Sequence, residues 1–322
     1  MKKFLSFMLT ALMACTLLAT TACTPAKDPN TINVGILQVA THDALDSARE
    51  GFEDTLTAWA TENGKTVNFN CQNANGDSQN ELTLADSIFS KNPDLVLGIA
   101  TSSARALVHA APSTTPVYFT AVTAPAEEQL VRSNSTGTSD MNPVAEQIAL
   151  IREINPSADA IGFIYNSSEN NSRIQFELAQ AKCTELGINL VPFTATQSSD
   201  LATVVDSISN VDAVYVPTDN LMAENITLIC STLHSKGIPV IAGEKGMCDA
   251  GEAVVTLGID YYALGVQTAQ MAIKVLEGKA NIADLDFEFY NQAPSFFINE
   301  ENALAAGLSQ ATIDALKSAH AA

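Results

Sequence analysis

A few carboxylates and hydroxyls in this chain have the types and positions needed to hold a small charged molecule. Asp219 and Glu244 each follow an apolar segment, where a carboxylate suits an ammonium group. Ser102 and Ser103 stand where a helix is expected to begin, and hydroxyls beside free backbone N–H groups favour a carboxylate or another anionic oxygen. Each has a simpler alternative, because Asp219 can cap the helix expected near Leu221 and the serines can cap their own helix. The pattern predicts noncovalent binding of a small polar molecule.

Other polar residues lie just past expected strands, where doubly wound sheets gather their ligands. Asn166 and Asn171 can donate and accept hydrogen bonds, which suits the polar end of an amino acid, although an Asx turn is the alternative in this Asn- and Ser-rich loop. His42 precedes a helix, where a position beside the cap is as compatible as a ligand contact. The remaining ligand-binding candidates are Gln38, Thr101, Thr123, Thr218, Asn220 and Asp260.

The common catalytic and cofactor motifs are missing from the sequence. It contains no GxGxxG after a strand, no GxxxxGK(S/T), no HExxH and no GxSxG. Its cysteines include no CxxC pair, which argues against a metal site. Asp219 and Glu244 could serve acid–base chemistry, but no nucleophile with suitable spacing accompanies them. We therefore expect no cofactor, no metal and no catalytic residue, and we do not expect an enzyme.

Short β-branched runs alternate with longer helical patterns twice along the chain, which is typical of an α/β fold. In the first half the patterns predict strands over 32–37, 66–71, 95–100 and 117–120, and helices over 44–63, 78–90 and 102–111. In the second half they predict strands over 160–165, 189–193, 213–216 and 239–242, and helices over 143–154, 173–186, 200–208 and 221–235. We expect two Rossmann-like, doubly wound parallel sheets. Gly51 and Gly265 fall inside helical patterns, where close packing is the expected reason.

Two segments of small residues are the expected crossings between the lobes, near 137–141 and at 256–259. Glycine and small side chains suit a hinge because a crossing strand must absorb rotation without a clash. Ordinary turns are the alternative at both places.

The first 22 residues have the pattern of a secretory signal. Two lysines follow Met1, and an apolar stretch then extends to Ala22. Cys23 follows small residues and is the predicted lipid-modified residue; Cys15 is a second candidate, but cleavage there leaves apolar residues in the linker. An uncleaved anchor helix is the remaining alternative. We expect a body outside the cytoplasm, anchored to the cell membrane by an N-terminal lipid, with residues 23–31 as its linker.

Charge and cysteine usage restrict the partners further. The 322 residues include 36 acidic and 16 basic side chains, so nucleic acid is not an expected partner. Cys71 ends an apolar run, and Cys183 and Cys230 lie in helical patterns, so we expect these three to be buried free thiols. A disulfide between Cys230 and Cys248 is left open.

Seven short segments carry a resemblance to a known family. They are Gly35-Ile36-Leu37-Gln38, Cys71-Gln72-Asn73-Ala74-Asn75-Gly76-Asp77, Ile99-Ala100-Thr101, Ala121-Val122-Thr123, Ser139-Asp140-Met141, Tyr215-Val216-Pro217-Thr218-Asp219-Asn220 and Gly258-Ile259-Asp260-Tyr261-Tyr262-Ala263-Leu264-Gly265. In their order and spacing, from about residue 32 to residue 308, the chain resembles the ABC-transporter substrate-binding proteins of the tryptophan/tyrosine-uptake type.

The resemblance implies a periplasmic-binding-protein-like fold of type I, with two lobes joined by three crossings. The lobes would be residues 32–138 plus 259–286 and residues 139–258 plus 287–322, with the helix over 261–277 rejoining the first lobe. It also implies a small ligand, often an aromatic amino acid, that is delivered to an ABC permease and its ATPase. The chain has Thr101-Ser102-Ser103-Ala104 where the family commonly has a Thr-Pro-Ala-Ala-like turn, which adds hydroxyls and leaves the ligand open.

The function expected from these observations is capture of an amino-acid-like ligand by hinge closure, in a lipid-anchored monomer that works with an ABC importer. An exported α/β enzyme, or the same receptor fold for a nucleoside, a sugar or another small metabolite, is the alternative. A ligand-responsive repressor can share this fold, but it would need a DNA-binding headpiece and a cytoplasmic address.

Overall fold

The computed structural model describes residues 28–249 and 252–321. The predicted signal at 1–22, the predicted lipidation site Cys23 and its alternative Cys15 lie outside the described residues. Within the described part of the chain, no helix is both long enough and apolar enough to cross a membrane.

The first lobe is built on a six-stranded sheet in the order β11-β5-β4-β3-β1-β2. The paired strands run parallel from β11 through to β1. The strands are β1 (Thr31–Gln38), β2 (Thr66–Asn73), β3 (Leu95–Ile99), β4 (Val117–Val122), β5 (Ser135–Ser139) and β11 (Glu288–Phe289). Its helices are α2 (Asp43–Glu62), α3 (Ser78–Phe89), α4 (Thr101–Ala110) and α11 (Tyr261–Leu276), with a short 3₁₀ turn η1 (Ile282–Asp284).

The second lobe has a six-stranded sheet of its own, in the order β12-β10-β9-β8-β6-β7. Its pairs are parallel except for β12, which runs antiparallel to β10. The strands are β6 (Ala160–Tyr165), β7 (Asn189–Thr194), β8 (Ala213–Val216), β9 (Val240–Ala242), β10 (Val255–Gly258) and β12 (Ser295–Ile298). The helices are α5 (Val144–Ile154), α6 (Asn170–Leu186), α7 (Ser198–Ser207), α8 (Asn220–Glu224), α9 (Ile226–Ser235), α10 (Gly246–Asp249), α12 (Glu300–Ala305) and α13 (Gln310–Ala319).

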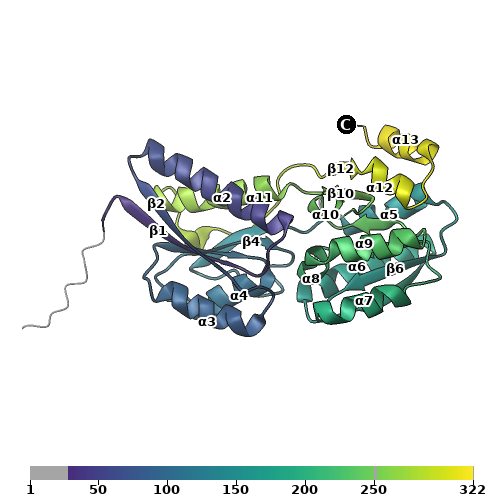
Figure 1. Cartoon of the computed structure of the whole chain (residues 1–322). Helices are drawn as coiled ribbons and strands as arrows, with labels where there is room; N and C mark the ends of the chain where they lie inside the picture. Colours follow the sequence, from purple (N-terminus) through teal and green to yellow (C-terminus); the bar gives the residue numbers. More distant parts are fainter. Residues whose placement is uncertain (1–27, 250–251, 322) are drawn as a thin grey trace, which may run out of the picture. The chain divides into compact units, whose positions relative to one another are not determined.

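Alternation of apolar residues along the strands builds two cores in the first lobe. Ile36 packs with the residues of α2 and α11, whereas its neighbour Leu37 packs with those of α3 and α4. The two helix pairs accordingly cover opposite faces of the sheet (Figure 1). The second lobe follows the same plan, because Phe163 packs with α5, α6, α12 and α13, and Ile164 packs with α7, α8 and α9. The predicted fold class, two parallel-sheet α/β lobes, is confirmed.

The chain passes from one sheet to the other three times: after β5, after β10 and after β11. Pairing in the first sheet continues to Ser139 and to Phe289, whereas the expected lobe boundaries fell at 138 and 286. Helix α11 packs against α2 of the first lobe. The crossings all lie at one end of the sheets, so the loops at the carboxyl ends of the strands face the other lobe.

Two glycines allow α2 and α11 to pack closely, as predicted for Gly51 and Gly265. A Cβ atom at Gly265 would lie 2.0 Å from the Ala48 carbonyl oxygen, and one at Gly51 would lie 2.1 Å from the Tyr262 carbonyl oxygen. Real Cβ atoms do not approach backbone oxygens so closely, so the two helices can touch only where both positions lack a side chain.

Replacing Gly265 with alanine should lower the free energy of unfolding by about 2 kcal/mol, because the added methyl group forces the two helix backbones apart. Chemical denaturation measures the change, with Gln270→Ala as the control, because Gln270 is an exposed position of the same helix. Equal stability of the two variants would contradict the close crossing.

The structure differs from the sequence-based expectations in two local features. The single helix expected over 221–235 is two helices, because α8 ends at Glu224 and Asn225 interrupts the helical backbone before α9. The expectation that Cys71 is buried is wrong: it is exposed on β2, an edge strand, where its thiol donates to Glu53 Oε1 at 3.1 Å. Cys183, Cys230 and Cys248 are buried and free, so the Cys230–Cys248 disulfide left open by the sequence is not formed.

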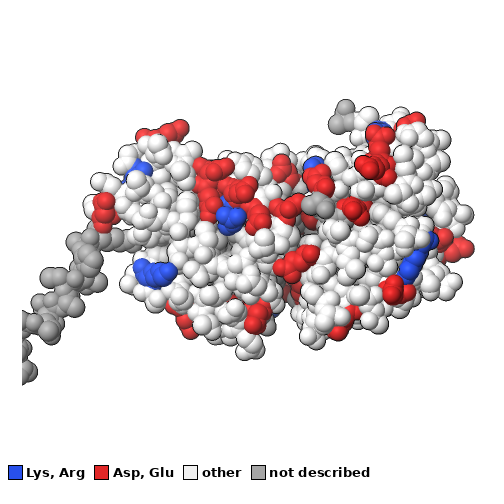
Figure 2. Space-filling model, in the orientation of Figure 1, with Lys and Arg blue, Asp and Glu red and all other residues white. Residues whose placement is uncertain are grey.

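The acidic excess of the sequence is visible on the surface. Asp and Glu side chains predominate over Lys and Arg on the face drawn in Figure 2. A groove of about 640 Å³ on the outside of the lobe boundary is lined by Asp43, Asp46, Glu50, Asp249 and Asp260 among others.

Candidate functional site

A small cavity of about 20 Å³ lies where the loops of the two lobes meet. From the first lobe it is lined by His42, Ala44, Leu45, Ala100, Thr101, Ala121, Thr123, Asp140 and Tyr261. From the second lobe it is lined by Asn171, Thr218, Asp219, Asn220, Ala223, Glu244 and Met247. Nearly all of these residues stand at strand ends or helix starts, the place where open α/β sheets bind ligands.

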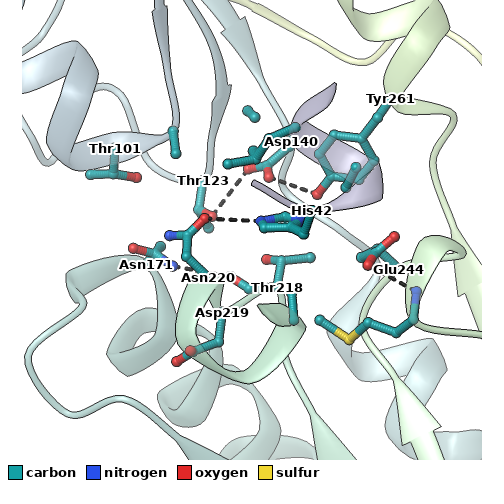
Figure 3. Close-up of a pocket in the computed structure, with 16 residues that line it drawn as sticks. His42, Thr101, Thr123, Asp140, Asn171, Thr218, Asp219, Asn220, Glu244 and Tyr261 are labelled. Atoms are coloured by element: carbon teal, nitrogen blue, oxygen red, sulfur yellow. Dashed lines mark hydrogen bonds between the residues drawn. The ribbon is translucent and has the colours of Figure 1, made fainter. Parts of the chain in front are cut away.

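Two alanines at the ends of neighbouring strands shape the first-lobe side of the cavity. Ala100 follows β3 with φ +75°, and Ala121 lies in β4 with φ +55°, where the pairing with β5 shifts register. Left-handed backbone at a non-glycine residue costs roughly 1 kcal/mol or more and is concentrated at functional sites. These turns bring Thr101 and Thr123 to the cavity wall (Figure 3).

Helix α4 presents its positive end to the same space. Its first-turn N–H groups have no intrahelical partner, and Ala100 at the N-cap has no side chain that could accept from them. The hydroxyls of Ser102 and Ser103 do not serve this end, because both donate to Glu81 Oε1, at 2.8 and 2.9 Å. The backbone of α4, more than these hydroxyls, therefore offers donors for an anionic group.

Asp140 is a buried carboxylate between the first and second lobes, 4% exposed. Tyr261 Oη donates to one of its oxygens at 2.8 Å, and Thr123 Oγ1 donates to the other at 3.1 Å (Figure 3). Burial raises the pKa of Asp140, and these two hydroxyls oppose that shift. Each oxygen keeps a further acceptor position, so Asp140 can receive a cationic donor.

Glu244 lies on the second-lobe side of the cavity and is 3% exposed. Its oxygens accept from the backbone N–H groups of Gly246 and Met247, the latter at 3.0 Å. Burial raises the pKa of Glu244 to about 7, with the nearby charges of Asp43 and Asp249 adding to the shift and the two N–H groups opposing it. Among the described residues, no cationic side chain is hydrogen-bonded to Asp140 or Glu244, so an ammonium group of a ligand would neutralise otherwise uncompensated buried charge.

Asp219 has a different place from the one its sequence position suggested. Its carboxylate accepts from Asn166 N at 2.6 Å, from Ser172 Oγ at 2.6 Å and from Met222 N at 2.9 Å. It caps α8 and points away from His42 and Asn220 (Figure 3). Burial, together with the charge of Glu169, raises its pKa. Asp219 therefore holds the β8–α8 loop, and its helix-capping alternative describes it better than contact with an ammonium group.

Replacing Asp219 with alanine should weaken ligand binding at least about tenfold, or roughly 1.4 kcal/mol. It should also lower the free energy of unfolding by about 2 kcal/mol, because three donors lose their acceptor and α8 loses its cap. Calorimetry and thermal unfolding measure the two effects. Unchanged affinity would show that the loop does not depend on this carboxylate.

The β8–α8 loop carries Thr218 and Asn220, which both reach the cavity. Gln175 Nε2 donates to Thr218 Oγ1 at 2.6 Å, and Asn171 Nδ2 donates to the Thr218 carbonyl at 3.0 Å. Asn220 Oδ1 lies 3.3 Å from His42 Nε2 across the lobe boundary. Burial lowers the pKa of His42, which favours the neutral ring. Asn170 also reaches across the boundary, since its amide donates to Glu128.

Several candidates from the sequence lie away from the cavity. Gln38 is buried within the first lobe and donates to the Ala40 carbonyl and to Asp46. Asn166 forms the Asx-type turn that was its alternative, since its Oδ1 accepts from Ser168 N and Oγ. Asp260 is exposed, caps α11 and lines the outer groove. The cavity brings together eight candidates, namely His42, Thr101, Thr123, Asn171, Thr218, Asp219, Asn220 and Glu244.

The strongest residues that sequence reasoning did not assign to the site are Asp140 and Tyr261. Asp140 falls in a segment read as a hinge, and Tyr261 was read as the start of a helix. The sequence signal that could have identified Asp140 is its position as a polar residue directly after a crossing strand. Every crossing must pass beside a site that lies between the lobes. Among the described residues, no grouping of His, Cys, Asp and Glu side chains could hold a metal ion.

Comparisons with known proteins agree with this geometry. The family described as ABC transporter substrate binding protein matches residues 33–319. A tyrosine-binding protein of Clostridioides difficile strain R20291 is 32% identical over 292 residues, covering 88% of this chain and 84% of that protein.

Two solved structures are equally similar in sequence but not in arrangement. An ABC domain in complex with L-Trp from Streptococcus pneumonia is 31% identical, with TM-score 0.80 over 88% of this chain and 98% of that one. A ligand-free, open substrate-binding protein with adhesive properties from Clostridium difficile is also 31% identical, with TM-score 0.65 over 87% of this chain and 96% of that one. The present structure thus has a higher TM-score with the structure described as an L-Trp complex than with the one described as ligand-free and open.

The matched family spans both lobes and the cavity between them, which confirms the resemblance seen in the seven sequence segments. Members of this family bind substrates and are not enzymes, which agrees with the absence of a catalytic motif from the sequence. The chain belongs to the ABC transporter substrate-binding protein family.

Proposed function

We propose that this protein is the extracytoplasmic solute-binding lipoprotein of an ABC importer, and that it captures an aromatic amino acid by closing its lobes around it. The arrangement of charge in the cavity carries the proposal. Uncapped N–H groups at the start of α4 suit a carboxylate, while the buried Asp140 and Glu244 suit an ammonium group. An amino acid carries both groups on the same α-carbon, and a neutral sugar carries neither.

The lining also supports an apolar side chain on the ligand. Ala44, Leu45, Ala223 and Met247 contribute apolar surface to a site whose other walls are polar. The tyrosine-binding relative and the L-Trp complex favour an aromatic ligand here.

Entry of such a ligand requires the lobes to move apart. The cavity of about 20 Å³ is far below the roughly 300–1,000 Å³ of typical small-molecule pockets. The three crossings after β5, β10 and β11 are the segments that would bend. The ligand would then add contacts to both lobes beside the direct contact between His42 and Asn220, which stabilises the closed arrangement.

Export and anchoring complete the proposal. The apolar segment ending at Ala22 and the small residues before Cys23 support cleavage and lipid attachment at Cys23, and residues 24–31 would then link the body to the membrane. From this position the protein would hand its ligand to an ABC permease and its ATPase.

A ligand screen tests the function. The purified protein is heated with each of the twenty amino acids, with nucleosides and with sugars, and any molecule that co-purifies is identified by mass spectrometry. We expect L-tyrosine, L-tryptophan or both to raise the melting temperature and to be recovered unchanged. A shift produced only by sugars or nucleosides would reject an amino-acid ligand, and conversion of the bound molecule to a product would indicate an enzyme.

A further inference from the structure

We propose that Glu169, which lies outside the cavity, fixes His42 as a hydrogen-bond acceptor for the ligand by orienting the side chain of Asn220. The inference rests on the proposed function and adds two things to it. It names a positioning residue that does not touch the ligand, and it requires the ligand to present an N–H or O–H donor to His42.

The Asn220 amide can have only one orientation. Its Nδ2 lies 2.6 Å from Glu169 Oε2. Its Oδ1 lies 3.3 Å from His42 Nε2, a contact drawn in Figure 3. A carboxylate accepts hydrogen bonds and does not donate them, so the amide nitrogen must face Glu169. The amide oxygen is therefore turned toward the His42 ring.

Glu169 is itself held in place by its own loop and by the loop that carries Asn220. Its Oε2 also accepts from the Asn220 backbone N–H at 3.2 Å and from Asn171 Nδ2 at 3.2 Å. Its Oε1 accepts from Asn166 Nδ2 at 3.1 Å and from the Leu221 backbone N–H at 3.4 Å. Because these donors come from the β6–α6 loop and from the first turns of α6 and α8, the carboxylate cannot turn away from Asn220 without breaking several contacts.

The orientation of Asn220 decides which nitrogen of His42 carries the proton. Asn220 Oδ1 can only accept, so His42 Nε2 must be the protonated nitrogen that donates to it. Burial lowers the pKa of His42, so the ring is neutral and Nδ1 keeps a lone pair. The two ring nitrogens thus have opposite roles: Nε2 donates within the protein and Nδ1 accepts.

His42 Nδ1 has no partner within the described residues, although it is buried. His42 lines the cavity. A buried acceptor without a donor costs roughly 1–3 kcal/mol, so a ligand donor at Nδ1 removes a penalty that the empty site carries. A ligand lacking a donor at this point leaves the penalty in place.

The hydrogen-bonded chain from Glu169 through Asn220 to His42 also crosses the lobe boundary. His42 precedes α2 in the first lobe, whereas Asn220 and Glu169 belong to the second. The acceptor role of Nδ1 is therefore set only when the lobes have closed, so selection for a donor acts at the closing step.

The tautomer of His42 is the direct test. Long-range ¹⁵N NMR of ¹⁵N-histidine-labelled protein saturated with L-tyrosine should show His42 neutral with its proton on Nε2, because the ligand holds the lobes closed. A His42→Gln variant assigns the resonance. A ring protonated on Nδ1, or on both nitrogens, overturns the proposal. If neither L-tyrosine nor L-tryptophan binds, the proposed function fails, and the spectrum is then recorded with whichever molecule co-purifies or raises the melting temperature, so that the role of Glu169 is tested separately.

Variants test the role of Glu169 separately. In Glu169→Gln the amide at 169 can donate as well as accept, so Asn220 is free to flip, and we expect mixed tautomers of His42 and about tenfold weaker binding of L-tyrosine. Glu185→Gln removes one charge from an exposed position of α6, the helix that Glu169 precedes, and serves as the control, with unchanged tautomer and affinity. A pure Nε2–H tautomer in Glu169→Gln would overturn the role of Glu169.

Ligand analogues identify the donor. L-phenylalanine lacks the phenol O–H of tyrosine, and 1-methyl-tryptophan lacks the indole N–H of tryptophan. If both analogues bind the unmodified protein at least about tenfold more weakly than the parent amino acids do, with no such difference in His42→Phe, the partner of His42 is the ring donor of the ligand. If each analogue binds as tightly as its parent amino acid and His42→Phe weakens the binding of all four ligands, the donor to His42 is the α-ammonium group. If His42→Phe weakens none, His42 accepts nothing from the ligand and the proposal fails.

Discussion

Replacing Asp140 with asparagine should weaken binding of L-tyrosine or L-tryptophan about 100-fold, a loss of about 2.7 kcal/mol. The carboxylate is buried, its two hydroxyl partners leave an acceptor position on each oxygen, and it faces the cavity. Asparagine has nearly the same shape but no charge, so an ammonium group that has left water would lose its counter-charge. Titration calorimetry measures the change.

The matched control for this variant is Asp86→Asn, which removes one negative charge from an exposed position of α3 in the same lobe. The control should bind as the unmodified protein does. If Asp140→Asn binds within about threefold of the control, the ammonium group lies elsewhere, and Glu244 becomes its remaining buried partner.

Ligand affinity should fall about 30-fold as the pH is lowered from about 8 to about 5.5, from the titration of Glu244 alone. Burial raises the pKa of this carboxyl from 4.5 to about 7, so in the empty site it binds a proton at weakly acidic pH. An ammonium group nearby favours the charged form, so the ligand must displace that proton and loses roughly tenfold in affinity for each pH unit below the pKa.

Calorimetry at pH 6 in buffers of different ionisation enthalpy should detect protons released on binding. Glu244→Gln should bind more weakly at pH 8 and lose most of the pH dependence. Without ligand the sign reverses: between about pH 4.5 and 7 the folded protein holds a proton that the unfolded chain has lost, so the free energy of unfolding falls as the pH rises. An affinity that is constant between pH 5.5 and 8 would place the ammonium group away from Glu244.

Strand and helix positions were largely predictable because each depends on local patterns of apolar residues. The runs 160–165 and 213–216 form strands with those bounds, and the other predicted elements differ by a few residues, except the helix expected over 221–235, which is two helices. Elements β11 and β12 were not predictable as strands, because β11 is only two residues long and both exist only through pairing with distant segments. The break between α8 and α9 at Asn225 was also not predictable, because the periodic pattern of apolar residues continues through this position.

The site was predictable in part, because the carboxyl ends of parallel strands gather at one edge whatever the sequence between them. That rule placed His42, Thr123 and Asn220 together without any knowledge of contacts. It could not show that Ser102 and Ser103 bond to the buried Glu81, whose position on α3 is set by packing. The orientation of Asn220 and His42 by Glu169 depends on contacts between segments that are far apart in the sequence. No local sequence pattern can predict such contacts.

Ala100 and Ala121, the alanines with positive φ at the ends of β3 and β4, restrict which substitutions can change the ligand that such a receptor binds. Ala100 and Ala121 bound the cavity with methyl groups, while the buried charges belong to Asp140 and Glu244, so size selection and charge selection reside in different residues. Positive φ is tolerated by glycine far better than by β-branched or bulky residues, and at Ala100, where ψ is 163°, the backbone conformation is essentially restricted to glycine. Only a few residue types can therefore replace these two alanines when the size of the bound substrate changes.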